Sequence, residues 1–470
     1  MLSWFRPRCP VNICEKVWTE RGLNWLAGTL GPARMRQAAI VLPTRQYFPD
    51  AYSGTHDEVR GLLDRVCGYM QVDPASLELE FHSPQAHPDA GGLYRRGERS
   101  VISVAENQLD DQERLIATLA HEVAHEILLG GELLTGDEPD HEWLTDLTVS
   151  FLGMGIFAAN TAVQQKNNLH LNWESWTIAK HGYMPARMSG YALALIARAR
   201  GETKPAWAAS LGTDAHVTLR DGLHYVEKTS DTLFDPDQPP PHGESRPLSG
   251  IVSDLGSTSA SRRLSALWDL RERSEPAVLE GVLKNLRDRD PLIRAEAADT
   301  LAVVADPEGR ACKELMDALR DEIAQVRARA ALALATLKTP LETRGPFEST
   351  LREELVLLMS DGNPRAAFAG TQALAAYAER CGEAATPLSQ LLKRALSECD
   401  YARLEELLPC VITLVPDSER FLREDVARGD EDLWRLIQSG LKRSKRRAVA
   451  ADARAVAGPW HVSSSHNALG

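Results

Sequence analysis

The spacing of hydrophobic residues changes character near the middle of the chain. In the first half, hydrophobic residues recur at helical spacing over 18–30, 58–70, 111–130, 142–160 and 185–200. Short hydrophobic runs of strand length lie between these segments, over 39–42, 77–81 and 100–105. Helices interrupted by a few short strands predict an α+β domain with a small sheet.

The second half has helical spacing throughout, and its sequence repeats. Clear copies begin at Asp288, Asp321 and Asp361, and a weaker copy begins at Asp254. The first two copies share an Arg-Ala-x-Ala-Ala core, and repeats of this length suit one helix pair each. The pattern resembles HEAT-like repeats, which implies an all-α solenoid whose periodic Asp and Arg residues are structural. The alternative is an Ala-rich helical bundle without true repetition.

A proline-rich stretch separates the two halves of the chain. Residues 235–243 contain four prolines, which lack the N–H donor that helix and strand interiors require. We therefore predict four parts: an α+β domain over 1–230, a linker over 231–252, a helical repeat domain over 253–440, and a basic, disordered tail over 441–470.

Composition narrows the possible functions. The 470 residues include 53 Lys and Arg against 66 Asp and Glu, and this net charge of −13 argues against nucleic-acid binding as the main function. The basic run at 442–447 is more simply a solvated chain end than a nucleic-acid site. Seven scattered cysteines form no CxxC pair, and neither a signal-peptide core nor 18 consecutive hydrophobic residues occurs, which favours a cytoplasmic protein.

The strongest chemical signal is the HExxH motif formed by His121, Glu122 and His125. Histidines four residues apart lie on one face of a helix, about one turn apart, so both can bind one Zn²⁺ ion. The glutamate between them can face a water molecule in the open coordination position. The motif lies in a segment of helical spacing that follows a predicted strand.

A hydrolytic zinc site needs a third protein ligand, and Glu142 is the candidate. Asp146 follows four residues later, where it can accept a hydrogen bond from the far nitrogen of a ligating histidine. His141 and Asp146 are rival third ligands. Adjacent helical residues diverge by about 100°, so His141 and Glu142 do not both bind one ion from a regular helix. We favour Glu142, since only it is followed by an aspartate at that spacing.

Together these motifs resemble the gluzincins, thermolysin-like zinc metallopeptidases in which HExxH is followed by a Glu-x-x-x-Asp helix. The resemblance implies an α+β zincin-like domain ahead of the all-α HEAT-like solenoid, with one Zn²⁺ per chain. It also implies His121, His125 and Glu142 as metal ligands, Glu122 as general base and Asp146 as the residue that orients a ligand.

Two features depart from the gluzincin pattern. Glu126 is charged where these helices usually carry an uncharged residue, which predicts an exposed helix flank or a basic partner. The Tyr or His that stabilises the oxyanion has no motif in this chain. Four residues are candidates by type only, and each is more simply structural: His181, Tyr183, Tyr191 and His224.

The predicted function is zinc-dependent hydrolysis of peptide bonds in a protein substrate that the HEAT-like repeats select or regulate. The alternative is a non-catalytic protein-interaction scaffold that contains a zinc-binding module. The expected partners are a protein or peptide substrate and a protein bound to the repeats, with no membrane involved.

Overall fold

A computed structural model describes the chain over 7–86, 91–97, 99–135, 140–161, 184–241, 243–271, 273, 275–304, 306, 309–337, 348–377 and 382–451. The chain divides between residues 242 and 243 into two compact units, and this boundary falls inside the stretch predicted as a linker. Each unit has its own hydrophobic core.

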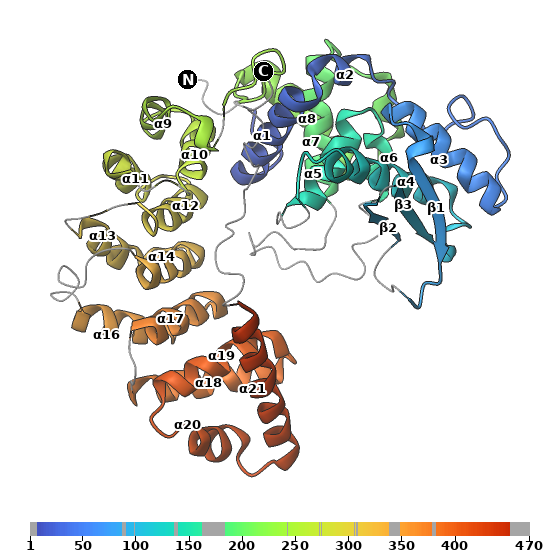
Figure 1. The fold of residues 1–470 in the computed structure, drawn as a ribbon. Helices are drawn as coiled ribbons and strands as arrows, with labels where there is room; N and C mark the ends of the chain where they lie inside the picture. The colour runs from blue at the N-terminus through green and yellow to red at the C-terminus, as the bar shows by residue number, and fades with distance from the viewer. Residues whose placement is uncertain are drawn as a thin grey trace. The chain divides into compact units, whose positions relative to one another are not determined.

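The first unit contains a three-stranded sheet with the strand order β1-β3-β2 (Figure 1). Strand β1 (Leu77–His82) pairs in parallel with β3 (Ser100–Ala105), and β2 (Gly92–Arg95) pairs antiparallel with β3 on its other side. The central strand β3 is almost fully buried, as its hydrophobic run predicts. Strand β2 is a short edge strand that the hydrophobic pattern does not predict.

Eight helices of this unit are described. They are α1 (Ile13–Leu30), α2 (Pro32–Gln37), α3 (His56–Met70), α4 (Gln112–His125), α5 (His141–Phe151), α6 (Gly155–Thr161), α7 (Ala186–Ala199) and α8 (Thr213–Thr229). Side-chain caps define where several of them begin. Asn12 and Glu15 form a capping box at the start of α1, and Thr55 and Glu58 form another at the start of α3.

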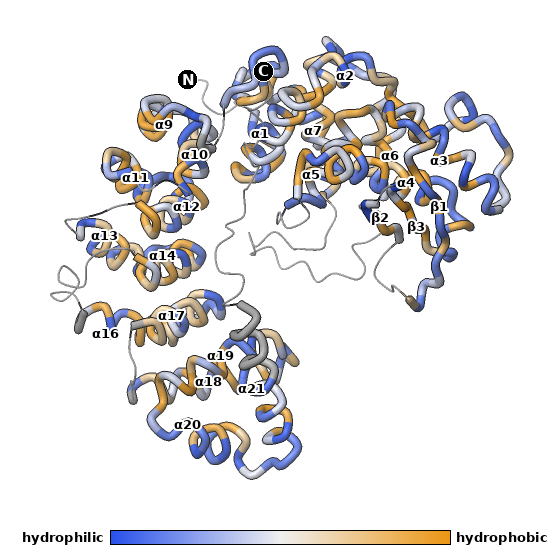
Figure 2. The backbone as a smooth tube through the Cα atoms, viewed as in Figure 1, coloured by the Kyte–Doolittle hydropathy of each residue, from blue (hydrophilic) through white to orange (hydrophobic). Residues whose placement is uncertain are grey.

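Helix α4 lies at the centre of the unit. It packs against α3, α5 and α6 and against strands β2 and β3. The hydrophobic segments of α4, α6 and β3 gather in this part of the unit (Figure 2). A helix enclosed in this way can hold polar side chains only where neighbouring elements offer them partners.

The predicted strand at 39–42 and the predicted continuous helix over 142–160 were both wrong, for one reason. Residues 39–42 form no strand, but the Val41 N–H donates to the carbonyl of Gly153 over 3.0 Å. Gly153 lies in the break between α5 and α6 with φ of 91°. A Cβ atom at Gly153 would lie 2.1 Å from the carbonyl oxygen of Ala39, so only glycine permits this close approach.

The second unit is a row of helix pairs, which confirms the all-α, HEAT-like architecture. The pairs are α9 (Leu248–Leu255) with α10 (Ala260–Asp269), α11 (Leu279–Asn285) with α12 (Pro291–Leu301), α13 (Arg310–Ala318) with α14 (Ala324–Thr336), α16 (Glu348–Leu358) with α17 (Pro364–Tyr377), and α18 (Ala385–Ser397) with α19 (Tyr401–Leu414). The second helices pack on one another in sequence, α10 on α12, then α14, α17 and α19 (Figure 1).

Ion pairs join successive repeats. The guanidinium of Arg294 donates to both carboxylate oxygens of Asp321 over 2.8 and 2.9 Å, and it also donates to the carbonyl of Asp288 over 2.9 Å. Arg327 repeats this pattern with Asp361 and the carbonyl of Asp321. Each arginine therefore holds the turn of its own repeat and the turn of the next one.

The same contacts correct the register of the weakest copy. Arg263 donates to Asp288 over 2.7 Å and to the carbonyl of Ser257 over 2.8 Å, so Ser257 occupies the position that aspartate holds in the later copies. Asp254, which the sequence predicted as the start, forms an ion pair with Arg246 instead. The series ends after the copy at Asp361, because Ala367 stands where the arginine would be.

The prediction of a disordered tail from residue 441 was wrong for its first part. Helix α21 runs over Glu431–Ala451 and includes the basic run at 442–447. Lys, Arg and Ala all favour helix, and α21 packs on α19, so nothing in this segment stops the helix at 440. Residues 452–470 lie outside the described residues. Within the described part of the chain, no helix combines the length and the hydrophobicity needed to cross a membrane.

We predict that Arg294→Ala destabilises the helices on both sides of its ion pair. The side chains of Arg294 and Asp321 are 11% and 14% exposed, so their charge-assisted hydrogen bonds are shielded from water. The loss should be about 1.5–3 kcal/mol. Native-state hydrogen exchange, read by mass spectrometry on peptides from α12 and α14, measures it.

The control is Arg435→Ala, which removes an ion pair to Asp432 whose side chains are 74% and 91% exposed. We expect a change of less than about 0.5 kcal/mol, since such exposed pairs contribute little. Equal exchange rates in the Arg294 variant and the wild type would contradict a stabilising role for the ion pairs between repeats.

Candidate metal centre

Helix α4 presents the three residues of the HExxH motif. Asp111 caps its first turn by accepting a hydrogen bond from the Arg114 N–H, and all residues from Leu115 to His125 are buried. His121, Glu122 and His125 are 4%, 3% and 6% exposed. Polar side chains buried this deeply need partners, and helix α5 supplies them for the two histidines.

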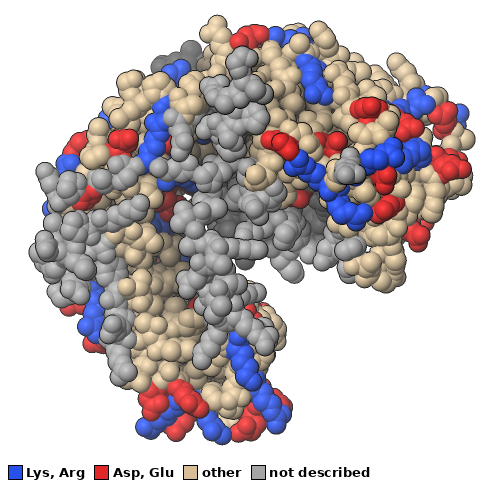
Figure 3. Space-filling view, in the orientation of Figure 1, with Lys and Arg blue, Asp and Glu red and all other residues tan. Residues whose placement is uncertain are grey.

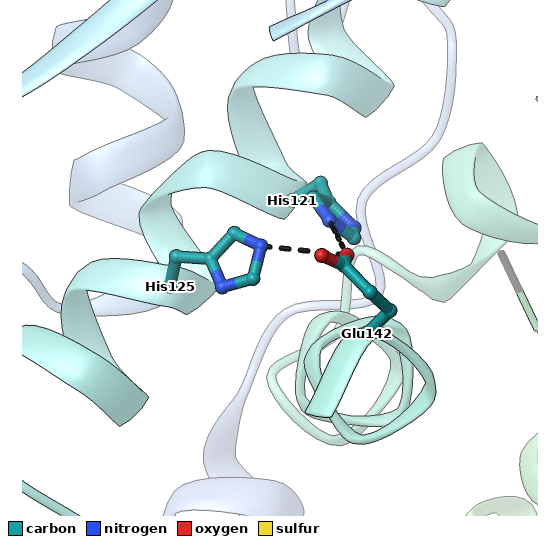
Figure 4. A group of neighbouring side chains, drawn as sticks. All are labelled: His121, His125 and Glu142. Atoms are coloured by element: carbon teal, nitrogen blue, oxygen red, sulfur yellow. Dashed lines mark hydrogen bonds and ion pairs between the residues drawn. The ribbon is translucent and has the colours of Figure 1, made fainter. Parts of the chain in front are cut away.

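Glu142, in the first turn of α5, reaches both histidines (Figure 4). Its Oε2 atom lies 2.9 Å from His121 Nε2 and 3.5 Å from His125 Nε2. One ligand atom from each of the three residues lies within 4.8 Å of the other two. The structure thus brings together the three residues that the sequence predicted as metal ligands.

This donor set fits a zinc ion. Two imidazole nitrogens and a carboxylate oxygen are the ligands of many hydrolytic zinc sites, with a fourth position left for water. Ligand atoms about 2.0–2.2 Å from a tetrahedral ion lie about 3.3–3.6 Å apart. The two separations to Glu142, 2.9 and 3.5 Å, are near this range, and all three ligand atoms lie within 4.8 Å of one another. Small side-chain adjustments would therefore suffice to accommodate the ion.

A second layer of contacts orients the histidines. Asp146 Oδ1 lies 2.9 Å from His121 Nδ1, on the opposite side of the ring from Glu142. The other oxygen of Asp146 accepts a hydrogen bond from the Met184 N–H over 2.7 Å. Thr145 Oγ1 lies 3.4 Å from His125 Nδ1. Asp146 is therefore placed where the sequence predicted it, and it leaves Nε2 of His121 available to a metal.

The start of α5 is anchored to α1. The indole N–H of Trp18 donates to the buried carboxylate of Asp140 over 2.9 Å, and the rings of Trp18 and Trp143 pack edge to face. Burial raises the pKa of Asp140. This contact fixes the first turn of α5, and with it the position of Glu142.

The carboxylates of the centre experience different environments. Burial alone raises the pKa of Glu142, but hydrogen bonds from His121, His125 and His141 outweigh it and hold that pKa well below its usual range. Burial raises the pKa of Glu122 to about 7. Burial also lowers the pKa of His125, which favours the neutral imidazole that binds metals.

Strand β2 passes directly over Glu122. A Cβ atom at Gly92 would lie 2.5 Å from Glu122 Oε1 and 2.6 Å from Thr118 Cγ2. Glycine at position 92 therefore lets the strand approach the helix at the point where the glutamate lies. No sequence pattern pointed to Gly92, because the hydrophobic pattern does not predict β2.

Glu126 hydrogen-bonds to a tyrosine, and not to the basic partner that the sequence predicted as one alternative. The phenol of Tyr94, on β2, donates to Glu126 Oε2 over 2.7 Å. The Tyr94 ring also stacks on the His125 ring at 6.0 Å between centroids. Burial raises the pKa of Tyr94 to about 12, so the phenol keeps its proton. No sequence pattern indicated this contact between residues of two distant elements.

The other candidates contribute less. His141 Nε2 lies 3.0 Å from Glu142 Oε1, so it contacts the third ligand from beside the predicted metal position. The hydroxyl of Tyr191 donates to Glu20 inside the core, and His224 is exposed on α8. Neither belongs to the metal-ligand group found among the described residues. His181 and Tyr183 lie outside the described residues.

Comparisons with known proteins do not extend these findings. No protein-family model and no curated protein matches the chain. Solved structures of the karyopherin Kap121p match 73% of this chain and 37% of their own. One structure of Kap121p has 15% identity and a TM-score of 0.33. The structure bound to RanGTP has 15% and 0.34, and the structure bound to the extreme C-terminus of the protein phosphatase Cdc14p has 16% and 0.35. These scores are too low to support conclusions about function.

We predict that Asp146→Asn weakens Zn²⁺ binding by about 10–100-fold, since partners that orient a ligating histidine have effects of this size. The substitution keeps the side-chain volume but removes the charge beside His121 Nδ1. Competition with a chromogenic zinc chelator measures the affinity.

Asp140→Asn is the matched control, because Asp140 is also buried but contacts Trp18 instead of a histidine, and the amide oxygen of asparagine still accepts the Trp18 N–H that fixes the start of α5. We expect its zinc affinity to stay near that of the wild type. An equal loss in both variants would show that the effect comes from disturbing α5 and not from the contact with His121.

Proposed function

We propose that this chain is a zinc-dependent hydrolase that cleaves peptide bonds. The observation that carries the proposal is the convergence of His121, His125 and Glu142 from two helices, with Asp146 behind His121. The resemblance of the HExxH and Glu-x-x-x-Asp motifs to those of gluzincins supports the same chemistry. One Zn²⁺ per chain would be held by the two histidines and Glu142.

Glu122 would act as the general base. A bound Zn²⁺ supplies a Lewis acid that lowers the pKa of water toward about 7 and polarises a carbonyl group. Glu122 is adjacent to the ligand His121 on α4, and its carboxylate is shielded under β2. It would accept the proton of the attacking water and deliver it to the nitrogen of the leaving amine.

The helical repeats would provide selectivity. Solenoids bind partners through extended surfaces, so the second unit is suited to hold a protein substrate or a regulator of the first unit. A peptidase that selects its substrates in this way would cleave few proteins.

A second candidate function is a non-catalytic interaction scaffold with a zinc-binding module. The observation that favours it is the absence of an evident oxyanion donor among the described residues, since the hydroxyl of Tyr94 is bound to Glu126 and that of Tyr191 to Glu20. A scaffold would need the metal for structure but would not need Glu122 as a base.

We predict that Glu122→Gln keeps one zinc per chain but reduces peptide cleavage by at least about 100-fold, because it removes the general base and leaves the ligands in place. Zinc is measured by elemental analysis. Cleavage is measured by mass spectrometry of new termini in a peptide library made from a whole proteome. Glu113→Gln, at the exposed start of the same helix, is the control and should keep both properties.

The outcomes separate the two functions. If the wild type binds one zinc and cleaves no peptide in the library, the hydrolase is wrong and the scaffold remains. The proposed metal centre is wrong if the reconstituted wild type holds no zinc. It is also wrong if the His121→Ala and Glu142→Ala variants still hold one zinc per chain.

A further inference from the structure

The second unit contains a cavity of about 1130 Å³ on its first three helix pairs. It is lined by the turn after α9 (255–258), by α11, by the turn before α12 (287–289) and by the first residues of α13. Helices α11 and α13 are neighbours in the stack, since ion pairs from Arg287 to Glu314 and from Arg310 to Glu280 join them (Figure 1).

The lining of this cavity is unusually basic. It includes six Lys and Arg residues and three Asp and Glu residues, although the chain as a whole has a net charge of −13. On the described surface drawn in Figure 3, by contrast, basic and acidic side chains lie interspersed. A concentration of positive charge in an acidic protein marks a place where an anion would bind locally.

The ion pairs of the lining account for only half of its basic residues. Asp288 pairs with Arg263 over 2.7 Å, and Glu314 and Glu280 pair with Arg287 and Arg310 across the two helices.

Three basic residues remain: Lys284, Arg289 and Lys313. All three are exposed, and none forms an ion pair within the described part of the chain. They come from α11, from the turn before α12 and from α13, so an anion that met all three would bridge two repeats.

We propose that this cavity binds an acidic, extended segment of a partner protein. Packed helices lie about 8–10 Å apart, which is about the rise of three residues of a polyproline II chain, whose residues three apart lie on the same side. Carboxylates three residues apart on an extended chain of this kind could therefore meet Lys284 on α11 and Lys313 on α13. The partly exposed side chain of Leu283 offers an apolar contact to the residues between them.

The lining argues against nucleic acid as the occupant. Proteins that bind single strands stack bases on aromatic side chains, and the described lining contains no aromatic residue. The three acidic side chains of the lining would also face a continuous phosphate backbone, whereas a peptide can present amide groups to them.

Fluorescence anisotropy with the full-length chain tests the proposal. The probe is a labelled ten-residue peptide of alternating Glu and Leu-Gly units, and inorganic tripolyphosphate and a single-stranded oligonucleotide serve as competitors. We expect Lys284→Glu/Lys313→Glu to weaken peptide binding by at least about ten-fold, since like charges would then face each other. Arg289→Glu should weaken it further.

Lys204→Glu/Lys228→Glu is the matched control. Both lysines are exposed, lie in the first unit and form no ion pair among the described residues, so this variant changes the net charge equally. It should bind the peptide as the wild type does. Circular dichroism must show that both double variants keep the helical content of the wild type.

Three results would overturn the proposal. The first is no peptide binding by the wild type at low salt. The second is an equal loss in the control variant, which would reflect total charge alone. The third is displacement of the peptide by the oligonucleotide or by tripolyphosphate at much lower concentration than by unlabelled peptide, which would assign the cavity to phosphate groups. None of these results depends on the metal centre.

Discussion

The burial of helix α4 is the constraint on which the first unit depends. Every residue from Leu115 to His125 is buried, so two imidazoles and a carboxylate lie where water does not solvate them. Such groups destabilise a fold unless other polar groups meet them. Glu142 and Asp146 meet His121 from both sides, and the bond between Trp18 and Asp140 fixes the helix that carries them. The metal-ligand geometry and the stability of this core therefore share the same contacts.

In the second unit, buried or half-buried polar groups are also paired, and the same pairs recur from repeat to repeat. Each of Asp288, Asp321 and Asp361 accepts hydrogen bonds from an arginine of the preceding repeat, and each also accepts one from a backbone N–H two residues later in its own turn. One aspartate thus shapes a turn and connects two repeats. Because the partners recur with the sequence period, each repeat contacts its neighbours in the same way.

Local patterns and distant contacts were not equally predictable. The period of the repeats and the spacing of His121, His125 and Glu142 are properties of short segments, and the structure has the expected helices at these positions. The break at Gly153 depends on the carbonyl of Ala39, and the partner of Glu126 is Tyr94 on a strand with little hydrophobic signal. No local pattern encodes such pairs. The sequence therefore predicted which three residues come together at the candidate site but not the strand that encloses Glu122.

In both units, the proposed sites are the places where the structure departs from the usual rules of burial and charge pairing. Most segments satisfy local propensity, burial and charge pairing together, and a sequence is expected to break these rules only where function requires it. In the first unit, the exception is a buried cluster of ionisable side chains that would be unnecessary in a hydrophobic core. In the second unit, it is a group of three basic residues left without acidic partners among the described residues, beside three other arginines that each pair with an acidic residue. Structure alone explains the paired arginines. The unpaired cations differ from other exposed lysines in lining one cavity together, which is the charge distribution that an anionic ligand would meet.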